Sequence, residues 1–346
     1  MPERDDLARA EALLDLNRPA EAAKQACAHL AAEPDSGRAL SVLARAELML
    51  GNHREAVEVT QTWIRTAPED ADAHAMLSRA LLGTNQARHA VIAGCEALRL
   101  APHSAYVHIV LGDAWLADDR PGYARDCARE AVRLAPHDPG AHLLMGLAKA
   151  QLGDTDAAKE SYRRVLELAP SNAAAMNNLA ALEIDRRRLR IASRLVTSGL
   201  GQDPQSAALH HNHDAVWFLL LNRASFALIG SSVVLGVLLL TGVSWWARAL
   251  AGVALVTTYL VLGRSVTRGL PRSSRTLPPG LIGRANAAQR TRLVLFGVAT
   301  VVTLCLAFAP EPVALIVAGA ILVALRLVTV PLFIGAIIVR ATRRSR

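Results

Sequence analysis

The hydrophobic pattern changes near residue 224 of this 346-residue chain. Before that point, apolar residues alternate with charged ones in the manner of amphipathic helices. After it, long apolar runs begin, and residues 224–247 contain no charged side chain. A helix of that length covers roughly 36 Å, which is enough to cross a bilayer. The pattern therefore predicts an all-α chain made of two unlike parts.

Three further apolar runs follow, at residues 249–263, 293–310 and 313–339. With the first run they predict a four-helix transmembrane bundle within residues 224–346, arranged as two hairpins. The fourth run contains Arg326, the one ionisable residue well inside an apolar run. We interpret Arg326 as reaching the inner headgroups or as marking a helix end, rather than as a substrate site.

The distribution of charge indicates how this bundle is oriented. Residues 224–346 contain thirteen arginines and a single acidic residue, a net charge of +12, whereas residues 1–223 carry −4. The loop 264–292 and the C-terminal tail hold most of these arginines. The positive-inside rule then predicts a multi-pass protein of the cell (inner) membrane, with the N-terminal part, this loop and the C-terminus in the cytoplasm. The N-terminus lacks the features of a secretory signal, which agrees with that orientation.

The arginine-rich loop is expected to contact membrane lipids. Anionic headgroups attract clustered arginines next to a membrane helix, and the predicted lipid-facing residues are Arg264, Arg268, Arg272 and Arg275. A binding site for an acidic partner or a phospholipid is the more specific alternative. Because the positive charge belongs to the membrane part, the composition predicts no nucleic-acid partner.

The N-terminal part is an internal repeat. Prolines occur at residues 34, 68, 102, 136, 170 and 204, always 34 residues apart. A period of this length is typical of a helix–turn–helix unit that stacks on its neighbours. When the proline takes position 32, the units are 3–36, 37–70, 71–104, 105–138, 139–172 and 173–206.

Two positions of the unit carry small residues, as close helix crossing requires. Position 20 is alanine throughout, and position 8 is alanine, serine or glycine. Between these positions lies a turn whose residues mostly tolerate left-handed backbone: Asn17, Gly51, Asn85, Asp119, Gly153 and Arg187. These features resemble the tetratricopeptide repeat family, with six repeats over residues 3–206 and a capping helix over residues 207–223.

This resemblance implies a solenoid whose first helices line a concave groove that binds a partner. Carried over by repeat position, the predicted partner-binding residues are Arg38, Arg45, Asp72, Arg79, Tyr106, Asp113 and Asn177. The three arginines are expected either to form a cationic strip for carboxylates or to be a solvated face. The function predicted is a membrane-anchored scaffold or adaptor for a cytosolic protein or peptide. The alternative is a transporter or channel-like membrane module regulated by the repeats.

Histidines are the remaining candidates for chemistry. His210, His211 and His213 with Asp214 look like a metal cluster, yet His74, His108, His142 and His210 all occupy position 4 of their units. A residue that recurs with the repeat is better explained by the repeat, so we expect no metal site. The four cysteines form no Cys-x-x-Cys pair. With no nucleotide loop and no nucleophile–base pattern, we expect neither a cofactor nor enzymatic activity.

Overall fold

The structure, a computed structural model, describes residues 3–220 and the isolated residues Ser244, Trp246, Leu250 and Val253. None of the helices in this described part is both long and apolar enough to span a membrane. The predicted transmembrane bundle within 224–346, and its loop 264–292 with Arg264, Arg268, Arg272 and Arg275, lie outside the described residues apart from those four positions.

The described residues form helices throughout, which confirms the prediction of an all-α solenoid for this part of the chain. The helices are α1 Glu3–Asp15, α2 Pro19–Ala32, α3 Gly37–Leu50, α4 His53–Thr66, α5 Ala71–Gly83, α6 Ala87–Leu100, α7 Ala105–Ala117, α8 Pro121–Leu134, α9 Pro139–Gln151, α10 Thr155–Leu168, α11 Ala173–Asp185 and α12 Leu189–Gln202. Residues 207–220 form a further helical segment. The chain divides into two compact units, residues 1–182 and 183–346.

The turn inside each helix pair has a left-handed residue. Asn17, Gly51, Asn85, Asp119, Gly153 and Arg187 all have positive φ, between 57° and 82°. Left-handed backbone after a helix lets the next amide groups reach back to the last carbonyl groups, as when Arg18 N donates to Leu13 O at 2.8 Å. Arg187 is the one member of this set whose side chain disfavours the conformation strongly, because a long side chain gains nothing from it.

Small residues sit where the two helices of a pair cross. The alanines at position 20 (Ala22, Ala56, Ala90, Ala124, Ala158 and Ala192) have no exposed surface. At position 8, Ser78 Oγ donates to Ala90 O at 2.8 Å. Gly146 occupies the same position, and a Cβ added there would lie 2.5 Å from the ring of buried Tyr162. The crossing therefore has no space for larger side chains at these positions.

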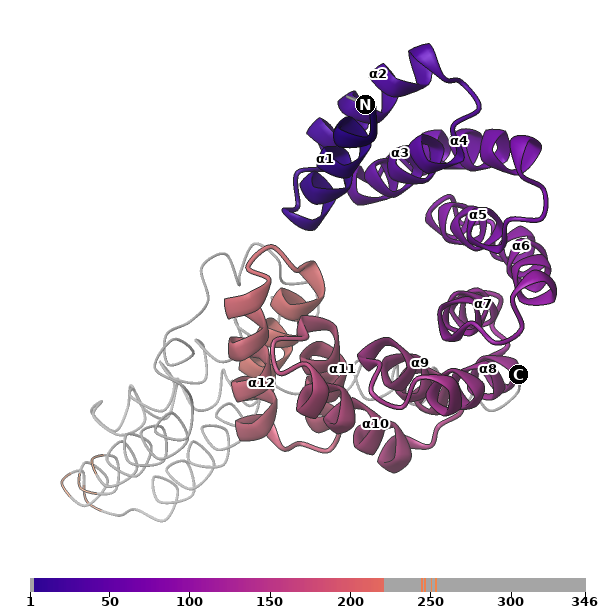
Figure 1. The fold of residues 1–346 in the computed structure, drawn as a ribbon. Helices are drawn as coiled ribbons and strands as arrows, with labels where there is room; N and C mark the ends of the chain where they lie inside the picture. The colour runs from indigo at the N-terminus through magenta and orange to yellow at the C-terminus, as the bar shows by residue number, and fades with distance from the viewer. Residues whose placement is uncertain (1–2, 221–243, 245, 247–249, 251–252, 254–346) are drawn as a thin grey trace, which may run out of the picture. The chain divides into compact units, whose positions relative to one another are not determined.

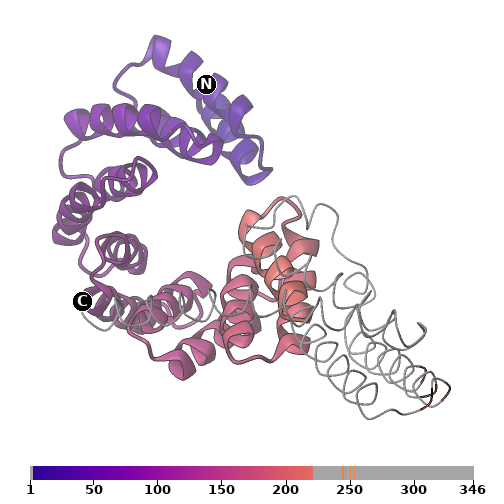
Figure 2. The ribbon, with the colours of Figure 1, turned by 180° about the vertical axis from the view of Figure 1, so that it is seen from behind.

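In the first unit, α1 to α10 stack in order and the first helix of each pair contacts the first helix of the next. Successive second helices contact one another less, so the row curves with the first helices inside. Figures 1 and 2 show this arrangement most clearly for α5 and α7, which lie on the inner side of α6 and α8. The concave face is thus built from α1, α3, α5, α7 and α9.

In the second unit, the helical segment 207–220 packs on α12. Leu189, Ala192 and Val216 are buried together, and Leu219 and Leu220 pack against them. The end of the last described helix therefore lies beside the beginning of α12.

Candidate functional site

The concave face presents side chains from repeat positions 2 and 9 of each first helix. These positions are seven residues apart, which is close to two helical turns, so they share one face. Position 9 of one unit and position 2 of the next are 27 residues apart, and this spacing defines side-chain pairs that bridge neighbouring helices. We call this row of pairs the inter-repeat ladder.

The first pair of the ladder is an ion pair. Arg38 on α3 donates through Nε and Nη2 to the two carboxylate oxygens of Glu11 on α1, at 2.8 and 2.7 Å. The hydrogen bond from Arg38 and the charges of Arg38 and Arg45 lower the pKa of Glu11. The guanidinium of Arg38 is therefore already matched by a carboxylate of its own chain.

The second pair has opposite charges that do not meet. Arg45 on α3 and Asp72 on α5 have the ladder spacing, and both side chains are exposed. Within the described part of the chain, Arg45 makes no ion pair shorter than 4 Å. Arg45 thus presents an unneutralised cation to the concave face.

The third pair joins α5 to α7. Arg79 Nη1 donates to the phenol oxygen of Tyr106 at 3.4 Å, across the same 27-residue spacing. Arg79 is exposed and Tyr106 half-buried. Because Tyr106 carries no charge, Arg79 keeps its positive charge while its direction is fixed by the hydroxyl.

Asp113 is a further acidic residue of the concave face, and the residue at its ladder position on α9 has no side chain. Position 2 of the next unit is Gly140, which has no side chain to offer. Asp113 is half-buried, and removal from water raises the pKa of its carboxyl to about 6, although the charge of Arg79 opposes the shift. The carboxyl group therefore changes its charge near pH 6 and is mostly ionised at pH 7.

The predicted cationic strip is therefore altered by the structure. Arg38 belongs to an internal ion pair, because position 9 of the first unit is the acidic Glu11, so Arg45 and Arg79 are the arginines of the strip that remain without one among the described residues. Asp72, at repeat position 2 on α5, is exposed. Asn177 on α11 is half-buried. Sequence reasoning missed Glu11, although its place at position 9 was a usable signal.

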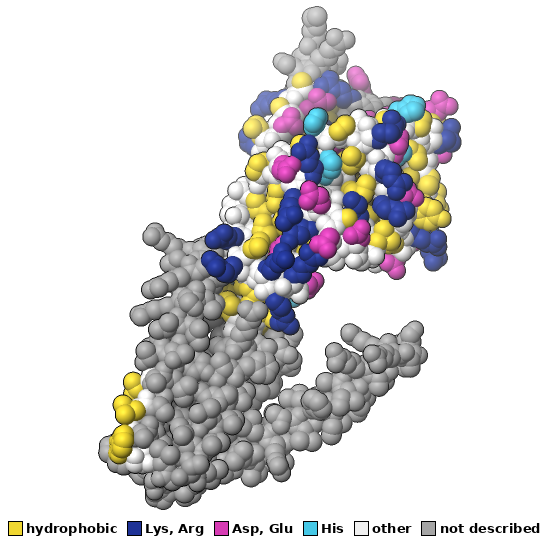
Figure 3. All heavy atoms as spheres, turned by 90° about the horizontal axis from the view of Figure 1, so that it is seen from below, with side chains coloured by type: hydrophobic (Ala, Val, Ile, Leu, Met, Phe, Trp, Pro, Cys, Tyr) yellow, Lys and Arg dark blue, Asp and Glu magenta, His cyan; other side chains and the backbone are white. Residues whose placement is uncertain are grey.

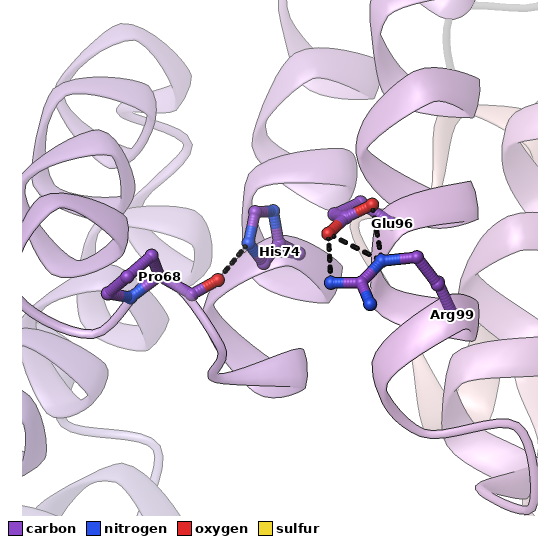
Figure 4. A network of polar contacts seen from close by, with 4 residues as sticks. All are labelled: Pro68, His74, Glu96 and Arg99. Carbon is purple, nitrogen blue, oxygen red and sulfur yellow. Dashed lines mark hydrogen bonds and ion pairs between the residues drawn. The ribbon is translucent and has the colours of Figure 1, made fainter.

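The recurring histidines contact backbone carbonyl groups. His74 Nε2 lies 2.9 Å from the carbonyl oxygen of Pro68, and Figure 4 shows the ring directed at that carbonyl beside the Glu96–Arg99 ion pair of α6. The same contact, at 2.9 to 3.0 Å, joins His108 to Pro102, His142 to Pro136 and His210 to Pro204. In the described part of the chain, no three metal-ligating side chains converge. The four histidines thus share one backbone contact that recurs with the repeat.

The outer surface balances its charges locally. Arg99 pairs with Glu96 at 2.7 Å and Arg133 with Glu130 at 2.5 Å, each within one helical turn. In Figure 3, Lys and Arg side chains are interspersed with acidic ones on the face shown. An open groove of about 1250 Å³ also lies on α4, α5 and α6, and no pattern in the sequence indicated it.

Comparison with known proteins identifies the repeat. Residues 13–80 and 139–172 each match a family model described as tetratricopeptide repeat. No curated protein matches the chain.

PilW and Cut9–Hcn1 share the fold, with TM-scores above 0.5. The crystal structure of PilW, described as a widely conserved type IV pilus biogenesis factor, is similar with a TM-score of 0.52 and 15% identity, over 61% of this chain and 98% of PilW. The Cut9–Hcn1 hetero-tetramer of APC/C gives a TM-score of 0.55 at 16% identity, over 61% of this chain and 42% of that one. TTC0263, a thermophilic TPR protein from Thermus thermophilus, gives 0.49 at 22% identity, over 52% of this chain and 98% of that one.

Proposed function

Because this chain carries tetratricopeptide repeats, a protein-interaction fold, we propose that it is a membrane-anchored scaffold that recruits a cytosolic protein. The observation that carries the proposal is the state of Arg45 and Arg79. Both are exposed on neighbouring first helices of the concave face, and neither has an ion pair in the described part of the chain. Their charges are available to a partner.

The concave face also favours a particular order of charged residues along the partner's chain. Arg45 and Arg79 suit carboxylate side chains, and the neighbouring Asp113 suits a basic one when it is ionised. An extended peptide with acidic residues followed by a basic residue would match the order of α3, α5 and α7. No catalytic step is required of such a scaffold, and we propose none.

The apolar runs of residues 224–346 support the anchoring half of the proposal. Carbonate extraction of membranes that contain the full chain tests it, since an integral protein stays with the membrane pellet. A reporter fused near Glu311 tests the orientation, and we expect it outside the cytoplasm. A chain released by carbonate, or a cytoplasmic reporter at Glu311, would contradict the anchor or its topology respectively.

Affinity purification of the full chain tests the recruitment half. Arg45→Glu/Arg79→Glu reverses both free charges and is expected to lose the partner. The matched control, Arg129→Glu/Arg163→Glu, reverses two exposed arginines on the second helices α8 and α10. Partners retained by the first variant, or lost equally by both, would remove the concave arginines from the interface.

A further inference from the structure

The beginning of the second unit concentrates positive charge. Five arginines stand between residues 186 and 194, and α12 itself contains no acidic residue. Arg188 lies 3.8 Å from the buried carboxylate of Glu183. Arg190 and Arg194 are exposed, are one helical turn apart, and form no ion pair within the part of the chain that the structure describes. Ile191 lies between them with 45% of its surface exposed.

Arg190 does not stabilise the helix that carries it. Positive charge in the first turn of a helix opposes the positive end of the helix dipole, so Arg190 is placed where it costs stability. On α6 and α8 the last-turn arginines Arg99 and Arg133 each pair with a glutamate, and the first-turn Arg88 of α6 lies 3.8 Å from Asp118. First-turn arginines also occur on α4 and α6, but each of those helices contains a glutamate, whereas α12 contains no acidic residue that could balance its arginines.

The same end of α12 adjoins the exit of the chain toward residue 224. Val216 is buried together with Leu189 and Ala192, and Leu219 and Leu220 pack against this cluster, so the helical segment 207–220 lies beside the first turn of α12. The first apolar run begins only four positions after Leu220, a reach of about 14 Å at most. If that run enters a bilayer, the beginning of α12 is held close to the headgroups.

We propose that Arg190, Ile191 and Arg194 form a contact surface for anionic phospholipid, which fixes the repeat domain against the membrane. The two guanidinium groups bind lipid phosphates, and the exposed isoleucine enters the boundary between headgroups and acyl chains. The inference rests on the proposed membrane anchor, yet it concerns different residues from the predicted lipid-facing loop.

A fluorescent label at position 191 tests the contact in the full chain. The four cysteines are replaced by alanine, Ile191→Cys is labelled with an environment-sensitive dye, and the chain is reconstituted in vesicles that contain lipid-borne spin-label quencher. We expect strong quenching with about 30% phosphatidylglycerol and weak quenching with phosphatidylcholine alone. Each arginine near an anionic surface is worth about a fivefold change in binding, so Arg190→Gln/Arg194→Gln should lower the contact equilibrium about 25-fold.

Tyr123→Cys provides the matched label control. Tyr123 is also the third residue of a second helix, α8, and is 55% exposed, but it lies in the first unit. Its label should show no dependence on phosphatidylglycerol. Equal quenching at residue 191 in both lipids would overturn the proposal even when the chain is inserted.

Flotation with neutral vesicles separates this result from failure of the anchor. A chain that does not float with phosphatidylcholine vesicles lacks the anchor. In that case, anionic vesicles are added to the chain in solution and quenching of the label at residue 191 is measured. Arginine-dependent quenching at residue 191 would still support the lipid-binding surface, and its absence would overturn it.

Discussion

His74 on α5 donates a hydrogen bond from Nε2 to the carbonyl oxygen of Pro68, which follows the second helix of the preceding repeat. The contact ties the end of one repeat to the beginning of the next. Because a carbonyl only accepts, the proton of the neutral ring must be on Nε2. Three other histidines at the same repeat position share this geometry.

The first prediction concerns this tautomer. Long-range ¹H–¹⁵N NMR at neutral pH should show His74, His108, His142 and His210 with the proton on Nε2, whereas exposed His103 should show a mixture. His74→Leu should lower the free energy of unfolding by about 1 kcal/mol, because the hydrogen bond is lost. A ring protonated on Nδ1 would contradict the contact.

The second prediction concerns the crossing of α9 and α10. Gly146→Ala places a Cβ 2.5 Å from the ring of Tyr162, which is 1% exposed and has no space to move. Chemical denaturation should show a loss of about 1–2 kcal/mol, the overpacking cost less the gain in helix propensity. Gly122→Ala on α8 is the control, since nothing lies within 4 Å of its added Cβ. That control should be neutral or slightly stabilising, and an equal loss in both variants would contradict the packing argument.

The third prediction concerns the pH dependence of Asp113. Burial raises the pKa of its carboxyl to about 6, above the unfolded value of about 3.9. Between these two values the folded state binds more protons, so this residue makes stability fall as pH rises from about 4 to about 6. Asp113→Asn should remove that fall and raise stability at pH 7 by roughly 1–3 kcal/mol. Denaturation curves of both proteins at pH 4.5 and 7 give the change in unfolding free energy with pH. The same change in both proteins would refute the raised pKa.

The fourth prediction concerns the turn between α11 and α12. Arg187 has a φ of 59°, a conformation that asparagine adopts more readily than arginine. Arg187→Asn should raise the unfolding free energy by about 0.5–1 kcal/mol. Asn85→Arg, the reverse change at the turn where φ is 60°, should lower it by a similar amount. No change in either protein would show that the turn is not strained.

The repeat could be predicted because its physics is local. Small residues at the helix crossing, left-handed residues at the turn and proline after the second helix each act within 34 residues, and each is visible as a fixed period. The period also explained the histidines, because a residue that recurs with the repeat keeps the same neighbours, here the proline carbonyl six residues earlier.

The candidate site was predicted less well because its side chains meet across repeats. In the sequence, Arg38 and Arg45 are equivalent candidates for a cation on the concave face. The structure shows that Arg38 is paired with Glu11. Likewise, Asp113 has its unusual pKa because burial removes it from water, while its ladder position offers only Gly140. Charge alone provided no measure of that burial.

The sequence by itself determined the helix pairs, their order and the turn conformations of this protein, since the residues that specify them are close in the chain. Only the tertiary structure decided which concave charges are neutralised and which remain available. It also placed the beginning of α12 beside the helical segment 207–220. Pairing, desolvation and proximity depend on distances between helices that curvature and packing set, and no short-range pattern contains those distances.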